Sequence, residues 1–171
     1  MKNSNYYNYE SPFGNIIITT NGTEITEIKL KLNAPTEPTA TPEPNTTPEP
    51  TAPPDTIIKE AAKQLDEYFK GKRKEFDLPI NPQGTDFQRK VWEALKQIPY
   101  GETKTYKQIA QTINKPNACR AVGQANNKNP IWIIIPCHRV IGASGKLTGY
   151  GGGLEMKQRL LEIEKGNKEK I

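Results

Sequence analysis

A proline-rich tract between positions 34 and 55 divides the chain and limits what its first half can fold into. The tract contains eight prolines, and the tetrapeptide Thr-Pro-Glu-Pro occurs in it at 41–44 and again at 47–50. Each proline fixes φ and removes a backbone N–H donor, so neither a helix nor a central strand can form there. We therefore expect an extended, solvated surface loop, with a ligand for a proline-binding module as the alternative.

The residues on either side of this tract predict a small antiparallel sheet and one helix. Residues 6–32 are rich in β-branched and alternating apolar side chains, and Asn21-Gly22 is typical of a two-residue hairpin turn. After the tract, apolar residues recur at three- and four-residue steps, which predicts a helix over 56–71. Gly71 is a plausible end for this helix, because glycine adopts the left-handed conformation that helix ends often require.

The rest of the chain is predicted to be mainly helical. Helices are expected over 85–98, 103–113, 118–125 and 154–165. The two short helices in the middle of this series form a helix-turn-helix candidate. The apolar run 131–135 has the length of a strand buried on both faces, and Pro136 would end it because proline cannot donate to a ladder.

These elements predict an α/β (α+β) fold. A small N-terminal antiparallel sheet with a helix would be followed by a mostly helical part that contains the helix-turn-helix. Pro79 and Pro82 mark a connector between the two parts. We therefore expect an N-terminal domain over 1–80, which includes the tract at 34–55, and a C-terminal domain over 81–171.

Charge is distributed unevenly between the two halves. Residues 1–85 carry 9 Lys and Arg against 12 Asp and Glu, a net charge of −3, whereas residues 86–171 carry 15 against 7, a net charge of +8. A basic half indicates a polyanionic partner such as nucleic acid. The chain has no run of about 18 apolar residues, which a membrane span would need, and its first residues lack the apolar core of a signal peptide. We expect an intracellular, cytoplasmic monomer with no membrane partner.

The chain has two cysteines, Cys119 and Cys137, and one histidine, His138. Two thiols are too few for a secreted disulfide framework, so both are expected to be free. Three soft ligands without tetrahedral spacing do not make a zinc site, and no cofactor-binding loop is present. We therefore expect neither metal nor cofactor. Cys119 is interpreted as a structural residue of a closely packed helix.

Cys137 and His138 follow the apolar run directly and form the candidate chemical site. A free thiol has a pKa of about 8.5, so a reactive cysteine needs a nearby base or positive potential. His138 can supply the base. Because adjacent residues in an extended chain point to opposite faces, a direct bond between the two side chains requires a turn, or else a bridging water.

The motif Pro-Cys-His-Arg-Val at 136–140, preceded by Asn129-Pro130, resembles the signature of the O6-alkylguanine-DNA alkyltransferases. The resemblance extends to three other motifs: Tyr-Gly-Glu-Thr at 100–103, Arg-Ala-Val-Gly at 120–123 and Tyr-Gly-Gly-Gly-Leu at 150–154. It is close over about residues 85–165 and weaker over 1–80. The family is one of DNA-repair methyltransferases, so the resemblance implies DNA repair by direct reversal of damage.

The resemblance implies a role for each matching residue of the site. Cys137 would take the alkyl group from guanine O6 and would be consumed in one turnover. His138 would act as a base through a water, and Glu164 would orient His138. Asn129 would brace the active-site turn. Tyr106 would donate a proton toward the leaving base.

The implied partner is double-stranded DNA that contains O6-alkylguanine, with O4-alkylthymine left open as a second substrate. The damaged base must leave the stack to be reached, and Arg120 would fill the space that it vacates. Small residues at Ala121 and Gly123 would let this helix approach the minor groove. Val140 and Gly151 would bind the flipped base. The family often has Ser at the position of Gly151, so here only the backbone amide would remain.

Three other functions remain open. A non-catalytic, damage-sensing DNA-binding protein could share this fold, but such proteins lack the cysteine. A helix-turn-helix regulator would need neither the Cys137-His138 pair nor Glu164. A cysteine hydrolase would turn over a peptide or ester repeatedly and would need no DNA.

Overall fold

The computed structural model describes residues 5–31 and 56–166, and the proline-rich tract at 34–55 lies outside the described residues. The elements in chain order are β1 (Asn5–Ser11), β2 (Gly14–Thr20), β3 (Ile25–Leu30), α1 (Thr56–Phe69), α2 (Asp86–Lys96), β4 (Lys104–Thr105), α3 (Tyr106–Thr112), α4 (Cys119–Asn127), the 3-10 turn η1 (Cys137–Arg139), β5 (Val140–Ile141) and α5 (Leu154–Glu164). The mixed α/β fold that the sequence predicts is confirmed.

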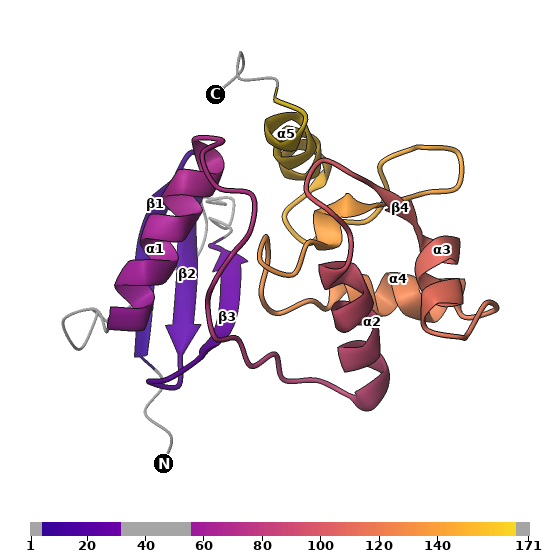
Figure 1. Cartoon of the computed structure of the whole chain (residues 1–171), viewed down its shortest axis with the longest axis horizontal. Coiled ribbons are helices and arrows are strands. Elements are labelled where there is room, and N and C mark those ends of the chain that lie inside the picture. Colours follow the sequence, from indigo (N-terminus) through magenta and orange to yellow (C-terminus); the bar gives the residue numbers. More distant parts are fainter. Residues whose placement is uncertain (1–4, 32–55, 167–171) are drawn as a thin grey trace, which may run out of the picture.

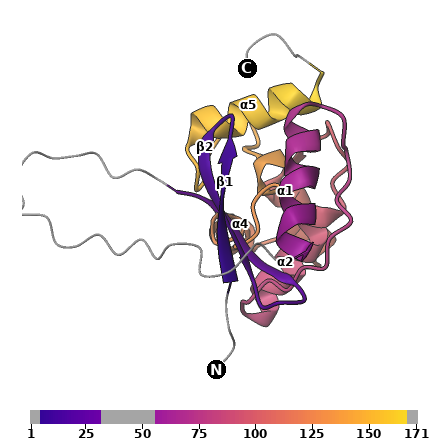
Figure 2. The ribbon, with the colours of Figure 1, turned by 90° about the vertical axis from the view of Figure 1, so that its left-hand side faces the viewer.

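The first half is an antiparallel sheet in the order β1-β2-β3, with α1 against one face (Figures 1 and 2). Alternate residues of β2 are buried, which is the period expected for a strand with one covered face. The prediction of a two-residue turn was wrong, because Thr20 pairs with Ile25 and leaves four residues between the strands. The Asn21 side chain explains the longer turn, since its oxygen accepts hydrogen bonds from the backbone N–H groups of Thr23 and Glu24.

Helix α1 ends where the sequence indicates. Gly71 has a φ of 68°, and its N–H donates to the carbonyl of Tyr68, while the N–H of Lys72 donates to the carbonyl of Glu67. This pair of bonds is a Schellman motif, which satisfies the last carbonyls of the helix. The stop leaves Tyr68 on the last turn of α1, where its side chain is fully buried.

Two capping boxes begin the helices of the second half. Thr85 with Gln88 caps α2, and Thr105 with Gln108 caps α3, each through reciprocal side-chain and backbone hydrogen bonds. The helix predicted from residue 103 therefore begins later, at Tyr106. Residues Lys104–Thr105 instead form β4, which pairs in parallel with β5. This pairing joins the start of α3 to the segment that carries the candidate cysteine.

The apolar run 131–135 is mostly buried, as predicted, but the prediction that it forms a strand was wrong. The segment is a series of tight turns, in which Ile134 N–H donates to Trp132 O and Ile135 N–H donates to Ile131 O. Ile133 has a φ of 73°, a conformation that costs a β-branched residue energy and that only its surroundings can enforce. This strained residue lies within the turn that reverses the chain, and Cys137 then begins η1 instead of continuing a strand.

The two halves share one core. The backbone of β3 is hydrogen-bonded to both parts of the chain. Its Ile25 N–H donates to Pro79 O in the connector, and its Ile28 N–H donates to Pro130 O in the second half. Helix α5 lies across the ends of the sheet and of α1 (Figure 2). Within residues 5–31 and 56–166, no helix is both long enough and apolar enough to cross a membrane.

Candidate functional site

The sulfur of Cys137 lies in a buried cluster where η1 meets the end of α4. Cys137 is 2% exposed. Asn129 donates from Nδ2 to the sulfur at 3.1 Å and to the carbonyl of Ile135 at 2.8 Å, while its Oδ1 accepts from the N–H of Ile131 at 3.0 Å. One side chain therefore closes the strained turn and contacts the thiol at the same time.

The His138 side chain extends into an ion-pair cluster with α5. Its Nε2 lies 2.7 Å from Oε1 of Glu164, and both side chains are fully buried. The carboxylate only accepts hydrogen bonds, so Nε2 must carry the proton and Nδ1 must hold the free lone pair. Nδ1 is buried and has no hydrogen-bond partner among the described residues. A histidine in this tautomer can accept a proton on the side that faces away from Glu164.

Arg139 completes the ion-pair cluster. Its Nε and Nη2 donate to Glu164 at 2.9 Å each, and its Nη1 donates to the carbonyl of Ile98 at 2.6 Å. The N–H of Gly101 also donates to Glu164 Oε2. The carboxylate is thus paired with a full positive charge, as a buried ion requires.

Burial and these partners set the charge states of the site. Burial raises the pKa of the Cys137 thiol to about 11, and the Asn129 hydrogen bond opposes this rise. Burial also lowers the pKa of His138, although the hydrogen bond and the charge of Glu164 act to raise it. For Glu164, burial alone would raise the pKa, but the hydrogen bonds and charges of His138 and Arg139 lower it to about 2. The resting state is therefore a neutral thiol, a neutral imidazole and a carboxylate.

A second buried cation lies beside the cluster. Lys157 on α5 donates to the carbonyls of Val140 and Thr148, at 2.5 and 2.7 Å. The hydroxyl of Tyr106 donates to the same Thr148 carbonyl at 3.1 Å. Lys157 therefore connects the start of α3, β5 and the loop that precedes the glycines at 151–153.

Gly151 lies against an aromatic ring. A Cβ at this position would come within 2.7 Å of the Trp132 ring, which also contacts the Tyr150 ring. Trp132 is held in place by a hydrogen bond from its Nε1 to the carbonyl of Asn129. The absence of a side chain at Gly151 is thus a packing requirement in this protein.

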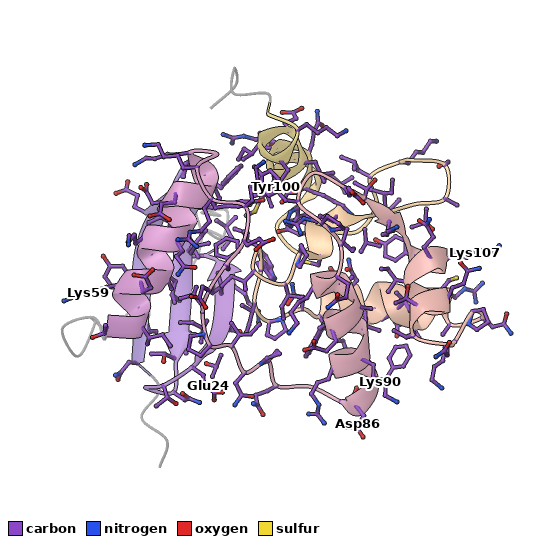
Figure 3. The ribbon with its side chains drawn as sticks, viewed as in Figure 1. Glu24, Lys59, Asp86, Lys90, Tyr100 and Lys107 are labelled. Carbon is purple, nitrogen blue, oxygen red and sulfur yellow. The ribbon has the colours of Figure 1, made fainter. Side chains whose placement is uncertain are left out.

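The residues expected at a nucleic-acid surface lie outside the buried cluster. Arg120 and Ala121 are exposed on the first turn of α4. Gly123 is half-buried, and a Cβ there would lie 3.7 Å from the Tyr106 ring, so α3 and α4 pack closely at this point. Lys107 extends outward from α3 in Figure 3.

The structure thus brings together four of the predicted residues, Cys137, His138, Asn129 and Glu164, and joins Tyr106 to Val140 through Lys157. Sequence reasoning assigned no role to Tyr68 or Arg139, both of which contact Glu164. Arg139 could have been suspected from its position beside His138. Tyr68 appeared only as part of the apolar stripe of α1. Within residues 5–31 and 56–166, no group of three His, Cys, Asp or Glu side chains could hold a metal ion.

Comparison with known proteins matches both halves of the chain. The model of the "6-O-methylguanine DNA methyltransferase, ribonuclease-like domain" matches residues 5–82, and that of the corresponding DNA binding domain matches residues 86–166. The methylated-DNA–protein-cysteine methyltransferase of Mycobacterium tuberculosis (strain H37Rv) is 49% identical over 160 residues, which are 94% of this chain and 92% of the relative. The chain belongs to the O6-methylguanine-DNA methyltransferase family.

Other members of the methyltransferase family agree with this placement. The relative from Methanosarcina barkeri is 63% identical over 111 residues, 65% of this chain and 70% of that protein. A crystal structure of the M. tuberculosis O6-methylguanine methyltransferase superposes with a TM-score of 0.78 at 45% identity and covers 95% of this chain and 93% of that one. A second structure, of the M. tuberculosis protein in complex with DNA, has a TM-score of 0.80 at 47% identity, with 94% and 92% covered. As a methyltransferase of this family, the protein is a DNA-repair enzyme.

Proposed function

We propose that Cys137 accepts the alkyl group of O6-alkylguanine in double-stranded DNA and that each protein molecule acts once. The observation that carries this proposal is the buried cluster in which Asn129 contacts the sulfur and Glu164 holds His138. A thiol whose pKa is about 11 is unreactive at rest, so its proton must be removed during the reaction. The neutral His138 beside it provides the base.

The proposed transfer is a single displacement. The thiol proton passes through a water to Nδ1 of His138, whose Nε2–H stays bonded to Glu164. The sulfur then attacks the alkyl carbon as the new S–C bond forms and the C–O6 bond breaks. The electron pair stays on O6, and Tyr106 donates a proton toward the base, which leaves as neutral guanine. The thioether product is stable, and no group of the site would regenerate the thiol.

The damaged nucleotide must leave the duplex for this reaction, at a cost of a few kcal/mol. We infer that α3 and α4 act as a helix-turn-helix, that Arg120 occupies the space of the extruded base, and that Ala121 and Gly123 permit approach to the minor groove. The exposure of Arg120 supports this role. Val140 and the Gly151 amide would bind the base. The DNA complex of the M. tuberculosis relative supports DNA as the partner of this chain.

We also propose that the chain has two domains, 1–80 and 81–171. The separate family matches at 5–82 and 86–166 support a boundary in this region. The shared core described above means that the two parts would not act independently.

The test is the intact mass of the protein after incubation with duplex DNA that carries one O6-methylguanine. We expect a gain of one methylene per chain that saturates at one. Cys137→Ser should lose the gain, whereas Cys119→Ser, the matched control at the half-buried second cysteine, should keep it. Lesion binding without any gain would support the damage-sensing alternative, and loss of both would remove the repair function.

A second test concerns the proposed DNA surface. Arg120→Ala should weaken binding to the lesion duplex and slow methyl transfer, while transfer to free O6-methylguanine base should be unchanged. Lys90→Ala is the control, because Lys90 is an exposed cation on α2 (Figure 3). Equal effects of the two substitutions would argue against a specific role for Arg120.

A further inference from the structure

Tyr68 reaches the ion-pair cluster from the other half of the chain. Its hydroxyl donates to Oε1 of Glu164 at 2.7 Å and lies 3.4 Å from Nε2 of His138. Tyr68 is fully buried. Figure 1 shows how this contact arises, because the end of α1 lies beside α5, which carries Glu164. The two residues are 96 positions apart in the sequence.

We propose that Tyr68 is a positioning residue of the alkyl-transfer site, whose hydroxyl fixes Glu164, and through it His138, in the orientation needed to accept the thiol proton. The N-terminal half therefore supplies part of the site. This inference rests on the proposed function, since it assigns a further residue to the same reaction.

The ring of Tyr68 is held firmly enough for this role. The rings of Phe69, Phe76 and Tyr100 surround it, with centroids 5.7, 5.4 and 6.1 Å away. The Schellman motif at Gly71 fixes the backbone just beyond it. A ring packed on three sides cannot turn its hydroxyl elsewhere, so the direction of the hydrogen bond to Glu164 is set by the fold.

The hydroxyl does something that packing alone does not. Oε1 of Glu164 accepts from Tyr68, from His138 Nε2 and from Arg139 Nη2. Each donor draws electron density from the same oxygen, so the Tyr68 hydrogen bond weakens the pull of Glu164 on the proton of His138. Removal of the hydroxyl would make Glu164 a stronger acceptor and would favour the protonated imidazole, which cannot act as a base.

Several charged or titratable groups contribute to the behaviour of His138. Glu164 and Lys157 from α5 and Arg139 from η1 act on its pKa directly. Tyr68 from α1, Tyr100 from the loop after α2 and Tyr150 from the glycine-rich loop interact with Glu164, and Tyr150 also interacts with Cys137 of η1. Of the three tyrosines, only Tyr68 has a hydrogen bond to Glu164 among the described contacts. Tyr100 instead donates to the backbone carbonyl of Ile163.

This difference provides a matched pair of variants, Tyr68→Phe and Tyr100→Phe. Each removes one hydroxyl and keeps the ring. The measurement is the single-turnover rate of methyl transfer from an O6-methylguanine duplex, across the pH range in which histidine titrates. For Tyr68→Phe we expect a rate about 5- to 10-fold lower near neutral pH, which is the value of one hydrogen bond. The acid limb of the pH–rate profile, where the rate falls as His138 takes up a proton, should move to higher pH. DNA affinity should not change, and Tyr100→Phe should retain the acid limb of the wild type.

A purely structural role for Tyr68 would lower the melting temperature and leave the acid limb in place, which would overturn the proposal. If Tyr68→Phe does not fold, 3-fluorotyrosine at position 68 keeps the shape and makes the hydroxyl a stronger donor. The acid limb should then move to lower pH, and an unchanged limb would also overturn the proposal. Failure of the wild-type protein to take up a methyl group would count against the proposed function itself, independently of Tyr68.

Discussion

The ammonium group of Lys157 lies 2.5 Å from the carbonyl oxygen of Val140, with no exposure to solvent. The same group holds the carbonyl of Thr148, so one cation fixes both ends of the loop between β5 and the glycine-rich segment. Burial lowers the pKa of Lys157 to about 8, while the nearby Cys137 thiolate would raise it. Lys157 is therefore a structural cation whose charge also favours the thiolate.

Replacement of Lys157 by methionine should loosen this loop. The substitution keeps the apolar stem but leaves the Val140 carbonyl without this donor and the Thr148 carbonyl with only the Tyr106 hydroxyl. Each lost hydrogen bond to a group that stays buried costs about 1–3 kcal/mol. Amide hydrogen exchange over 142–149 should accelerate, and methyl transfer should slow. Lys165→Met, at the exposed end of α5, is the control. Unchanged exchange in Lys157→Met would mean that the loop is held by other contacts.

Asn129→Ala should affect stability and reactivity together. Asn129 is 1% exposed and satisfies the N–H of Ile131 and the carbonyl of Ile135. Their loss should lower the free energy of unfolding by about 2–4 kcal/mol, measured by urea denaturation. The methyl-transfer rate should fall as well, because the turn before Cys137 is strained. Asn127→Ala, at an exposed position on α4, should leave both quantities near the wild-type values.

Acidification should destabilise the fold in two stages. The folded pKa of His138 lies below its ordinary value of 6.5, so the unfolded chain binds the proton first and stability begins to fall below that pH. The folded pKa of Glu164 is about 2 against an ordinary value of 4.5, so its contribution, on the order of 3 kcal/mol, is present above pH 4.5 and is lost as the pH falls toward 2.

Urea denaturation from neutral to strongly acidic pH measures both stages. Glu164→Gln should be less stable at neutral pH, since it leaves Arg139 without its counterion, and should lose most of the second stage. A Glu164→Gln protein whose stability falls as steeply as that of the wild type below pH 4.5 would assign the acid sensitivity to other carboxylates.

Gly151 and Trp132 should behave as a coupled pair. Gly151→Ser places a Cβ within 2.7 Å of the Trp132 ring, which predicts a loss of about 1–3 kcal/mol from overpacking. In a Trp132→Leu background the same serine should cost less, because the ring is gone. A double-mutant cycle of unfolding free energies measures the coupling. Additive effects would show that the serine is accommodated by backbone movement instead.

The local signals in the sequence were sufficient for most of the elements. Although the start of α3 was predicted at residue 103 instead of after Thr105, the signals at Thr85 and Gly71 act through neighbours a few positions away and were legible in the chain. The apolar run at 131–135 was not, because its composition suits a strand while its conformation depends on hydrogen bonds to Asn129. A pattern of apolar residues reports burial and does not report a turn enforced from outside the run.

The sequence by itself determined which residues are chemically competent: one thiol beside the single histidine, in a motif shared with a family of known chemistry. The tertiary structure decided how they are used. It placed Glu164 against His138, as the resemblance implied, paired that carboxylate with Arg139, and added Tyr68 from the opposite half of the chain. These contacts join α1, η1 and α5, and sequence spacing carries no information about which distant side chains share a buried carboxylate. Burial then fixes the charge states, because a charge removed from water persists only where the fold provides its partner.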